Sequence, residues 1–265
     1  MRKMLFVLFV TMCCFIAVSG CNKKSKAETL RVGATPVPHA EILNLIKDDL
    51  KKSGVDLEII EFTDYITPNI ALDDGQIDAN FFQHQPYLDT FVRDRGMKLV
   101  SLAGIHIEPL GLYSNKIKSI TELQEGAVLA IPNDPTNEGR ALLLLQSNGL
   151  IMLSDDAGLE GTPKNIVDNP QKILFRELDA AQLPRVLNDV DAAVINGNFA
   201  MEAKLNPMQD AIILEGADSP YVNIITVRTG AENDPRLQAL ANALKTEKVK
   251  QFIADKYNGG VVAVF

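Results

Sequence analysis

The residues best suited to hold a charged ligand lie at the start of one apolar helix, in the stretch IPNDPTNEGRALLLLQ at 131–146. Asp134 or Thr136 can cap this helix, so that its first backbone N–H groups point outward, where an anion would satisfy them. Arg140 follows within about the first turn, where the helix dipole disfavours a cation. We therefore interpret Arg140 as the partner of a negative group. The alternative is an ordinary surface arginine behind a well-capped helix start.

Aromatic side chains and a histidine lie together at the end of another apolar run, in the sequence FFQHQPY at 81–87. Because successive residues of a strand face opposite sides of a sheet, one of the two phenylalanines belongs to the core. The other, with His84 and with Tyr65 before a helix, can form an apolar and polarizable wall. Such a wall suits a thioether, since sulfur packs favourably against the edges of aromatic rings.

Three asparagines follow or begin strands of the second half. Asn196 and Asn198 come directly after the apolar run 192–195, and Asn223 begins a β-branched run at 222–228. Singly, each is typical of a turn. An amide both donates and accepts hydrogen bonds, so the three together with Arg140 match a ligand that carries an ammonium and a carboxylate group.

The common signatures of enzymes are missing after residue 21: there is no Gly-rich phosphate loop, no GxSxG, no HExxH and no CxxC pair. We predict no catalytic residue, no cofactor and no bound metal. Two alternatives remain. A hydrolase would need a nucleophile beside a base, which the sequence does not offer. A zinc-importer component would use His39, His84 and His106, which all lie near the ends of first-half strands but lack a local ligand spacing.

Composition excludes further classes of protein. The net charge of −8 makes the chain a poor candidate for binding nucleic acid, which calls for a basic patch. The cysteines are Cys13, Cys14 and Cys21, so the body of the chain holds no disulfide framework. Its stability must come from burial, and the length suffices for two modest cores.

The N-terminal segment has the pattern of a secretory signal. Arg2 and Lys3 precede an uncharged apolar run that ends in Val18-Ser19-Gly20-Cys21. This ending resembles the lipobox of bacterial lipoproteins, in which the cysteine becomes the lipidated first residue. We therefore expect a signal peptide at 1–20, a lipid on Cys21 and a lysine-containing tether at 21–28 that anchors the protein to a membrane. The alternative is an uncleaved anchor with a chance cysteine.

From residue 29 onward, strand and helix patterns alternate, which predicts largely parallel sheets covered by helices. Expected strands are 30–34, 55–62, 77–82, 98–105, 128–131, 173–177, 192–195, 211–214 and 222–228. Expected helices are 38–52, 65–72, 85–95, 181–187, 199–204, 234–244 and 247–257, besides the helix of Arg140. We predict two α/β lobes, lobe I at 29–112 plus 226–265 and lobe II at 113–225, with two crossings and a ligand cleft between them. Residues 154–169 are expected to form an irregular surface insertion.

Six motifs in this order resemble the NLPA lipoprotein family, the methionine-binding lipoproteins of ABC importers. They are GATPVPHAEIL at 33–43, DYITPNIAL at 64–72, IDANFFQHQPYLD at 77–89, IPNDPTNEGRALLLL at 131–145, DAAVINGNFA at 191–200 and SPYVNII at 219–225. The resemblance implies an α/β, two-lobed periplasmic-binding-protein-like fold with two mixed sheets, helices on both faces and two crossover strands. It also implies a non-enzymatic, extracytoplasmic lipoprotein, lipid-anchored to the cell membrane, that delivers methionine to the permease and ATPase of an importer.

The family's binding residues carry over onto individual positions. Arg140 matches the arginine that pairs with the ligand carboxylate, and Asn198 and Asn223 match the asparagines at the amino and carboxylate end. The side-chain pocket is matched by Tyr65, Phe82 and His84. Asn196 also lies within a motif, without an assigned contact, and Phe199 stands where the family pattern has tyrosine. The resemblance leaves open whether the ligand is L-methionine, D-methionine or a dipeptide that contains methionine.

Overall fold

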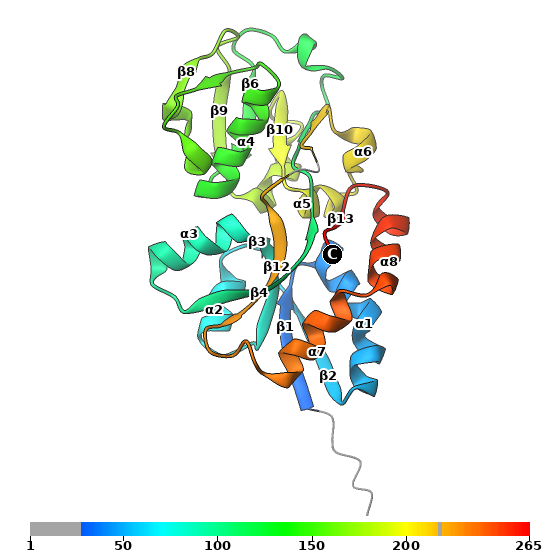
Figure 1. Cartoon of the computed structure of the whole chain (residues 1–265). Helices are drawn as coiled ribbons and strands as arrows, with labels where there is room; N and C mark the ends of the chain where they lie inside the picture. Colours follow the sequence, from blue (N-terminus) through cyan, green and yellow to red (C-terminus); the bar gives the residue numbers. More distant parts are fainter. Residues whose placement is uncertain (1–27, 217–218) are drawn as a thin grey trace, which may run out of the picture.

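The computed structural model of the protein describes residues 28–216 and 219–265. These residues form two α/β lobes, one above the other in Figure 1. The predicted signal peptide, Cys21 and the tether up to residue 27 lie outside the described residues, whereas Glu28, which we had assigned to the tether, begins the first strand. Within the described residues, no helix has the length and apolar character needed to cross a membrane.

Lobe I is built on a sheet of six strands in the order β13-β4-β12-β3-β1-β2. Strand β1 runs parallel to β2 and β3, and β12 runs antiparallel to β3 and β4, so the sheet is mixed. Its strands are β1 (Glu28–Ala34), β2 (Val55–Glu61), β3 (Ala79–His84), β4 (Leu99–Ile107), β12 (Val222–Arg228) and β13 (Val262–Ala263). The central strand β3 is buried along its whole length, which explains its continuous apolar and amide sequence.

Helices cover both faces of this sheet (Figure 1). One face carries α1 (Glu41–Lys52), α7 (Pro235–Leu244) and α8 (Glu247–Tyr257), and the other α2 (Thr67–Asp73) and α3 (Gln85–Arg95). Helix α1 is typical: Ile42, Leu43, Ile46 and Leu50 recur at helical spacing and are all buried. The α-helix itself begins at Glu41, and the predicted start at Pro38 falls within the preceding short π-helical segment (Pro36–Ala40).

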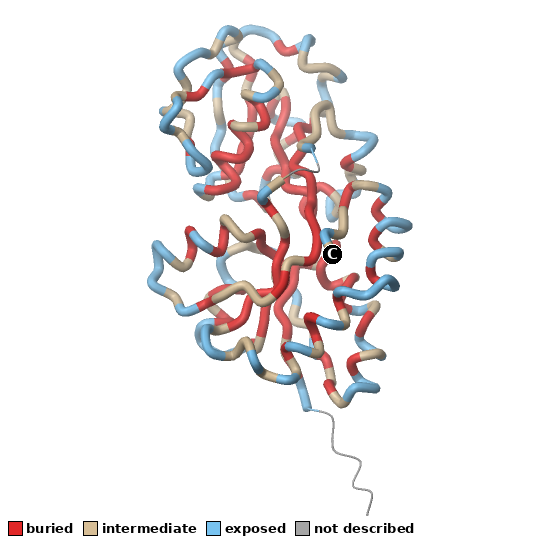
Figure 2. The backbone as a smooth tube through the Cα atoms, in the orientation of Figure 1, coloured by how far each residue is buried: buried red, intermediate tan, exposed pale blue. Residues whose placement is uncertain are grey.

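Lobe II has its own mixed sheet, in the order β11-β5-β10-β6-β9. Its strands are β5 (Gly111–Tyr113), β6 (Val128–Pro132), β9 (Leu174–Leu178), β10 (Ala192–Ile195) and β11 (Ile213–Leu214). Around it lie α4 (Pro135–Ser147), α5 (Gly197–Glu202), α6 (Pro207–Asp210) and the 3-10 segments η2 (Ile120–Glu122) and η5 (Ala180–Val186). The helix expected at 181–187 is a 3-10 segment; Pro184 within it has no N–H to donate. Figure 2 shows that burial concentrates on the strands of both sheets and on the helix faces that cover them.

The chain passes between the two sheets twice, between Ile107 and Gly111 and between Leu214 and Val222. Strand β5 pairs only within the sheet of lobe II and β12 only within the sheet of lobe I, among the described residues. Both crossings lie within a few residues of the predicted boundaries after 112 and 225. The exact division of the chain between the lobes stays a prediction.

The segment 154–169 is more ordered than expected, because it packs on α4. It contains two 3-10 turns, η3 (Gly158–Glu160) and η4 (Pro163–Asn165), and ends in β8 (Ile166–Asp168), which pairs with β7 (Met152–Leu153). A Cβ atom on Gly139 of α4 would lie 2.2 Å from the carbonyl oxygen of Leu159. Only a glycine permits η3 to approach α4 so closely. The expectation of an irregular loop at 154–169 is therefore wrong, because the segment contains short regular elements that pack on α4.

Candidate functional site

A narrow pocket lies between the lobes, where β3, β6 and β10 end. All seven residues that the sequence predicts for the ligand site line it: Tyr65, Phe82, His84, Arg140, Asn196, Asn198 and Asn223. Five residues that we did not predict complete the lining: Gln83, Tyr87, Glu108, Asn137 and Gly197. Its free volume is about 20 Å³, enough for about one water molecule. In this closed arrangement, a larger ligand can enter only after the walls move apart.

Arg140 is buried, with 4 % of its side chain exposed, so the alternative of a surface arginine is wrong. Its Nε donates to the carboxylate of Glu215 at 3.0 Å, and its Nη2 contacts the same carboxylate and donates to the Glu108 carbonyl oxygen at 2.8 Å. The guanidinium also lies over the ring of Tyr221, 4.2 Å from its centroid. The predicted negative partner therefore exists within the protein, as Glu215.

The start of α4 is capped by the protein itself. Asp134 is the N-cap residue, and its carboxylate accepts hydrogen bonds from the backbone N–H and the side-chain amide of Asn137, at 3.0 and 2.9 Å. The helix begins at Pro135, as its fixed backbone angle favours. Two of the N–H groups expected to face an anion, those of Asn137 and Glu138, are therefore already satisfied by Asp134.

The asparagines of the pocket leave two buried polar atoms without a hydrogen-bond partner among the described residues. Asn196 donates to Asn137 at 2.7 Å but its Oδ1 accepts nothing, and Asn198 accepts a hydrogen bond from Tyr65 but its Nδ2 donates to nothing. Burying an unsatisfied polar atom costs about 1–3 kcal/mol. One free acceptor and one free donor in the same pocket indicate a polar ligand that supplies both.

Aromatic rings form the opposite wall. The Tyr65 ring lies 5.9 Å from those of Phe82 and Tyr87 and 4.9 Å from that of Phe199, between centroids. Phe81 instead faces the core of lobe I, so the expected division between the two phenylalanines is observed. Tyr87, which we did not predict, donates through its hydroxyl to the carbonyl of Tyr65 at 2.8 Å and fixes that part of the wall.

His84 is held as a neutral ring in a defined tautomer. Its Nδ1 accepts the backbone N–H of Tyr87 at 3.1 Å, so its Nε2 carries the proton and donates to Asn137 Oδ1 at 3.1 Å. Burial, and then the charge of Arg140, lower the pKa of His84 to about 3. Because Asn137 belongs to lobe II, His84 connects the two lobes.

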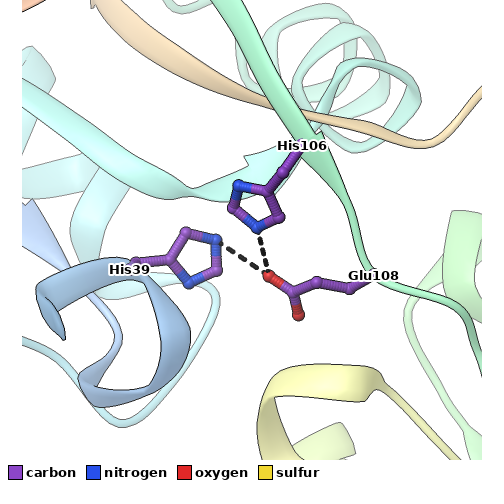
Figure 3. Close-up of side chains that lie close together, drawn as sticks. All are labelled: His39, His106 and Glu108. Carbon is purple, nitrogen blue, oxygen red and sulfur yellow. Dashed lines mark hydrogen bonds and ion pairs between the residues drawn. The ribbon is translucent and has the colours of Figure 1, made fainter. Parts of the chain in front are cut away.

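The three histidines do not gather at one point. His84 lies apart, while His39 and His106 meet at Glu108 (Figure 3), which the sequence analysis overlooked although it follows a strand end. These three residues could together hold a metal ion, since their ligand atoms lie within 4.8 Å of one another. Hydrogen bonds explain the same cluster, because His106 Nε2 bonds to Glu108 Oε1 at 2.7 Å and His39 Nε2 bonds to Asn223 Oδ1 at 3.0 Å. The alternative of a zinc site built from all three histidines is therefore wrong.

The family model described as NlpA lipoprotein matches residues 30–265. The chain belongs to the NlpA lipoprotein family. A probable D-methionine-binding lipoprotein MetQ of Vibrio cholerae is 44% identical over 249 residues, 93% of each chain. A nutrient binding protein from Burkholderia cenocepacia, solved bound to methionine, is 49% identical, with a TM-score of 0.87 over 89% of this chain and 100% of that one. A solved methionine binding protein MetQ is 41% identical, with a TM-score of 0.87 over 89% of this chain and 98% of that one.

These relatives confirm both the family resemblance and the two-lobed, periplasmic-binding-protein-like fold. The resemblance covers essentially all of the described residues. Within the family pocket, the contacts of individual side chains with a ligand remain predictions.

A second, larger cavity of about 850 Å³ lies beside the narrow pocket and is lined by both lobes. Tyr65 and Tyr87 line both spaces. The two tyrosines therefore lie between the pocket and the wide part of the cleft.

Glu138 is a buried carboxyl on α4 that lines neither space. Burial, with repulsion from Glu177 and Asp134, raises its pKa from 4.5 to about 7. Its ionisation is thus harder in the folded than in the unfolded chain, so stability should fall as the pH rises from about 4.5 to 7. We expect Glu138→Gln to raise the ligand-free melting temperature at pH 8 more than at pH 4. An equal shift at both values would show that this carboxyl does not titrate as its surroundings imply.

Proposed function

We propose that this protein is an extracytoplasmic solute-binding lipoprotein that captures methionine between its two lobes and delivers it to an ABC importer. The observation that carries the proposal is the pocket, where a guanidinium, an unpaired amide donor and an unpaired amide acceptor face an aromatic wall. The guanidinium and the two amide atoms suit the charged end of an amino acid, and the aromatic wall suits a thioether. The names of the relatives support the same ligand.

Arg140 is proposed to hold the ligand carboxylate. A guanidinium has five N–H groups, and the bonds to Glu215 and to the Glu108 carbonyl use at most three of them. At least two therefore remain for a ligand. Glu215 holds the guanidinium from the side of a separate surface cavity, which Arg140 also lines, so the ligand carboxylate need not displace it.

Capture is proposed to work by closure of the lobes, as a shift of population toward the state in which both lobes touch the ligand. Polar contacts join the lobes in this closed arrangement. Tyr65 bonds to Asn198 and His84 to Asn137 inside the cleft. At its edge, Glu160 accepts from Thr90 at 2.9 Å and pairs with Arg93, with Nη1 and Oε1 2.8 Å apart. Opening the cleft must break these contacts, and a ligand that bridges the same walls would favour closure again.

A hydrolase on this scaffold finds no support in the pocket. None of the twelve residues that line it is serine, threonine or cysteine, and its histidine bonds to an asparagine and a backbone N–H. The usual nucleophile beside a base is therefore missing from the lining. We propose binding without catalysis.

The proposed ligand can be tested on the purified protein without assuming its identity. Denaturation followed by mass spectrometry of released small molecules should yield methionine, and a calorimetric titration of the refolded protein should bind L-methionine or D-methionine saturably. The same titration after treatment with a chelator should be unchanged. Failure to bind either isomer, or a requirement for zinc, would contradict the proposal.

The lipid anchor is proposed on Cys21, from the signal pattern that ends in this residue. Relatives named outer membrane lipoprotein support a lipoprotein at a membrane. A Cys21→Ser protein should lose labelling by a fatty-acid analogue and move from the membrane to the soluble fraction, since one or two acyl chains then no longer hold it. A Cys13→Ser control should retain both. Unchanged labelling of the Cys21→Ser protein would refute the assignment.

A further inference from the structure

Glu108 lies in the pocket directly beside Arg140, just after β4 where the chain leaves lobe I. Its side chain is 6 % exposed. Because Arg140 Nη2 donates to the Glu108 carbonyl at 2.8 Å, the acidic and the basic residue of the pocket are in direct contact through the backbone of one of them. With His84 neutral, Glu108 and Arg140 are the acidic and the basic residue of the lining.

Two histidines of lobe I lie against the carboxylate of Glu108 on one side. His106 Nε2 lies 2.7 Å from its Oε1 and His39 Nε2 lies 3.2 Å from the same atom (Figure 3). The other ring nitrogen of His39 lies 2.6 Å from the hydroxyl of Thr35. With the Thr35 hydroxyl as donor there, Nε2 of His39 carries the ring proton and donates it to Oδ1 of Asn223 at 3.0 Å, so its 3.2 Å contact with Glu108 is the longer one.

Both rings are neutral imidazoles, of which His106 donates to Glu108 and His39 donates to Asn223. Burial lowers the pKa of His39 to about 4 and that of His106 to about 3. They therefore supply N–H groups and no positive charge. Burial also raises the pKa of Glu108, as expected where desolvation outweighs the nearby charges. The carboxylate is fixed in orientation but not neutralised by these partners.

The second carboxylate oxygen, Oε2, points away from both rings in Figure 3, toward α5. There it lies 3.4 Å from the point where a Cβ atom on Gly197 would stand. Gly197 and Asn198 of α5 line the pocket. The carboxylate also accepts a hydrogen bond from the backbone N–H of Asn198, and on this side it faces the same space as the unpaired side-chain amide of Asn198.

We propose that Glu108 is the counter-ion of the ligand's α-ammonium group, and that His106 positions its carboxylate for that role. The inference rests on the proposed function and narrows the ligand to a free α-amino acid. In such a ligand, one carbon carries both charged groups, which matches an acidic and a basic residue in contact. A dipeptide would separate its end charges by roughly one further residue, about 3.5 Å.

The test compares two ligands that differ only in the amino group, L-methionine and 4-(methylsulfanyl)butanoate, by calorimetric titration. The wild-type protein should prefer methionine at least a hundredfold. Glu108→Gln should weaken methionine at least a hundredfold, yet bind the butanoate as tightly as the wild type or more tightly, because this anion no longer meets a buried carboxylate. The matched control is Glu138→Gln, which changes a buried carboxyl outside the pocket and should keep the wild-type preference.

Equal weakening of both ligands by Glu108→Gln would make the residue structural and overturn the inference. Glu108→Asp keeps the carboxylate on a shorter side chain, so it should retain part of the preference for methionine over the butanoate. This variant also serves as the test if Glu108→Gln does not fold. His106→Leu should lower the preference for methionine about tenfold, whereas a purely structural role would weaken both ligands alike. A wild-type protein that binds no methionine would refute the proposed function, while normal binding with an unchanged preference in Glu108→Gln would refute this inference alone.

Discussion

Replacing Phe82 with alanine should weaken the binding of methionine roughly ten- to a hundredfold while it weakens the binding of alanine far less. Phe82 lines the narrow pocket next to Tyr65 and Tyr87, on the wall proposed for the thioether. Contact with an aromatic side chain of this size is worth about 1.5–3 kcal/mol, and each 1.4 kcal/mol changes the affinity about tenfold. Titrations of both amino acids with both proteins give the ratio directly.

The matched control is Phe91→Ala. Phe91 packs in the same aromatic cluster as Phe82 and lines the large cavity but not the narrow pocket. Both substitutions should lower the ligand-free melting temperature, because both remove a buried ring. Only Phe82→Ala should change the preference between methionine and alanine. If both ligands lose affinity equally, Phe82 supports the fold and the thioether lies elsewhere.

His84 is expected to behave differently from Phe82, although the sequence suggests the same role for both. Its Nδ1 caps α3 and its Nε2 bonds to Asn137 across the cleft. Alanine at this position removes a helix cap and a contact between the lobes at once. The structure therefore predicts a loss of affinity for every ligand that requires closure, and a melting temperature that falls even without ligand.

Much of the fold follows from local sequence patterns. Helix α3 and strand β12 have the predicted bounds, Gln85–Arg95 and Val222–Arg228. Pro86 favours the first turn of α3, and Gly96 ends it in the left-handed conformation that glycine adopts easily. Strand β12 is an uninterrupted run of strand-forming residues that can only be buried within a sheet. Where such local signals agree, the element is fixed before any tertiary contact is known.

The parts that sequence reasoning missed depend on partners far apart along the chain. Arg140 and Glu215 are separated by 75 positions, and no local spacing reveals that they meet. Glu108 stands directly after the observed end of β4 at Ile107, a little beyond the predicted strand 98–105, and close to His106, which we did consider. A carboxyl near a strand end was therefore an available signal. The 3-10 turns at 158–165 depend on their packing against α4, which a pattern of glycines and prolines does not reveal.

Arg140→Ala should lower the affinity for methionine by two to three orders of magnitude or more. Loss of one partner of a buried, hydrogen-bonded charge pair costs roughly 3–5 kcal/mol, at about 1.4 kcal/mol for each tenfold. Arg140→Lys should also bind poorly, since a single ammonium cannot contact Glu215, the Glu108 carbonyl and a ligand carboxylate with the planar geometry of a guanidinium. Titration with methionine measures both losses.

The ligand-free protein should also lose stability in Arg140→Ala. An arginine at an exposed helix start, as the sequence alone suggests, would not have this effect. The substitution removes a ring contact with Tyr221 and leaves the carboxylate of Glu215 without its partner. Arg176→Ala, at an exposed position on β9, is the matched control and should change neither property.

To separate binding from folding, L-methioninamide, which lacks the carboxylate, serves as the second ligand. Wild type should prefer methionine strongly and Arg140→Ala should not. If the variant keeps the preference, or binds methionine with nearly native affinity, the guanidinium holds only Glu215 and the ligand carboxylate binds elsewhere.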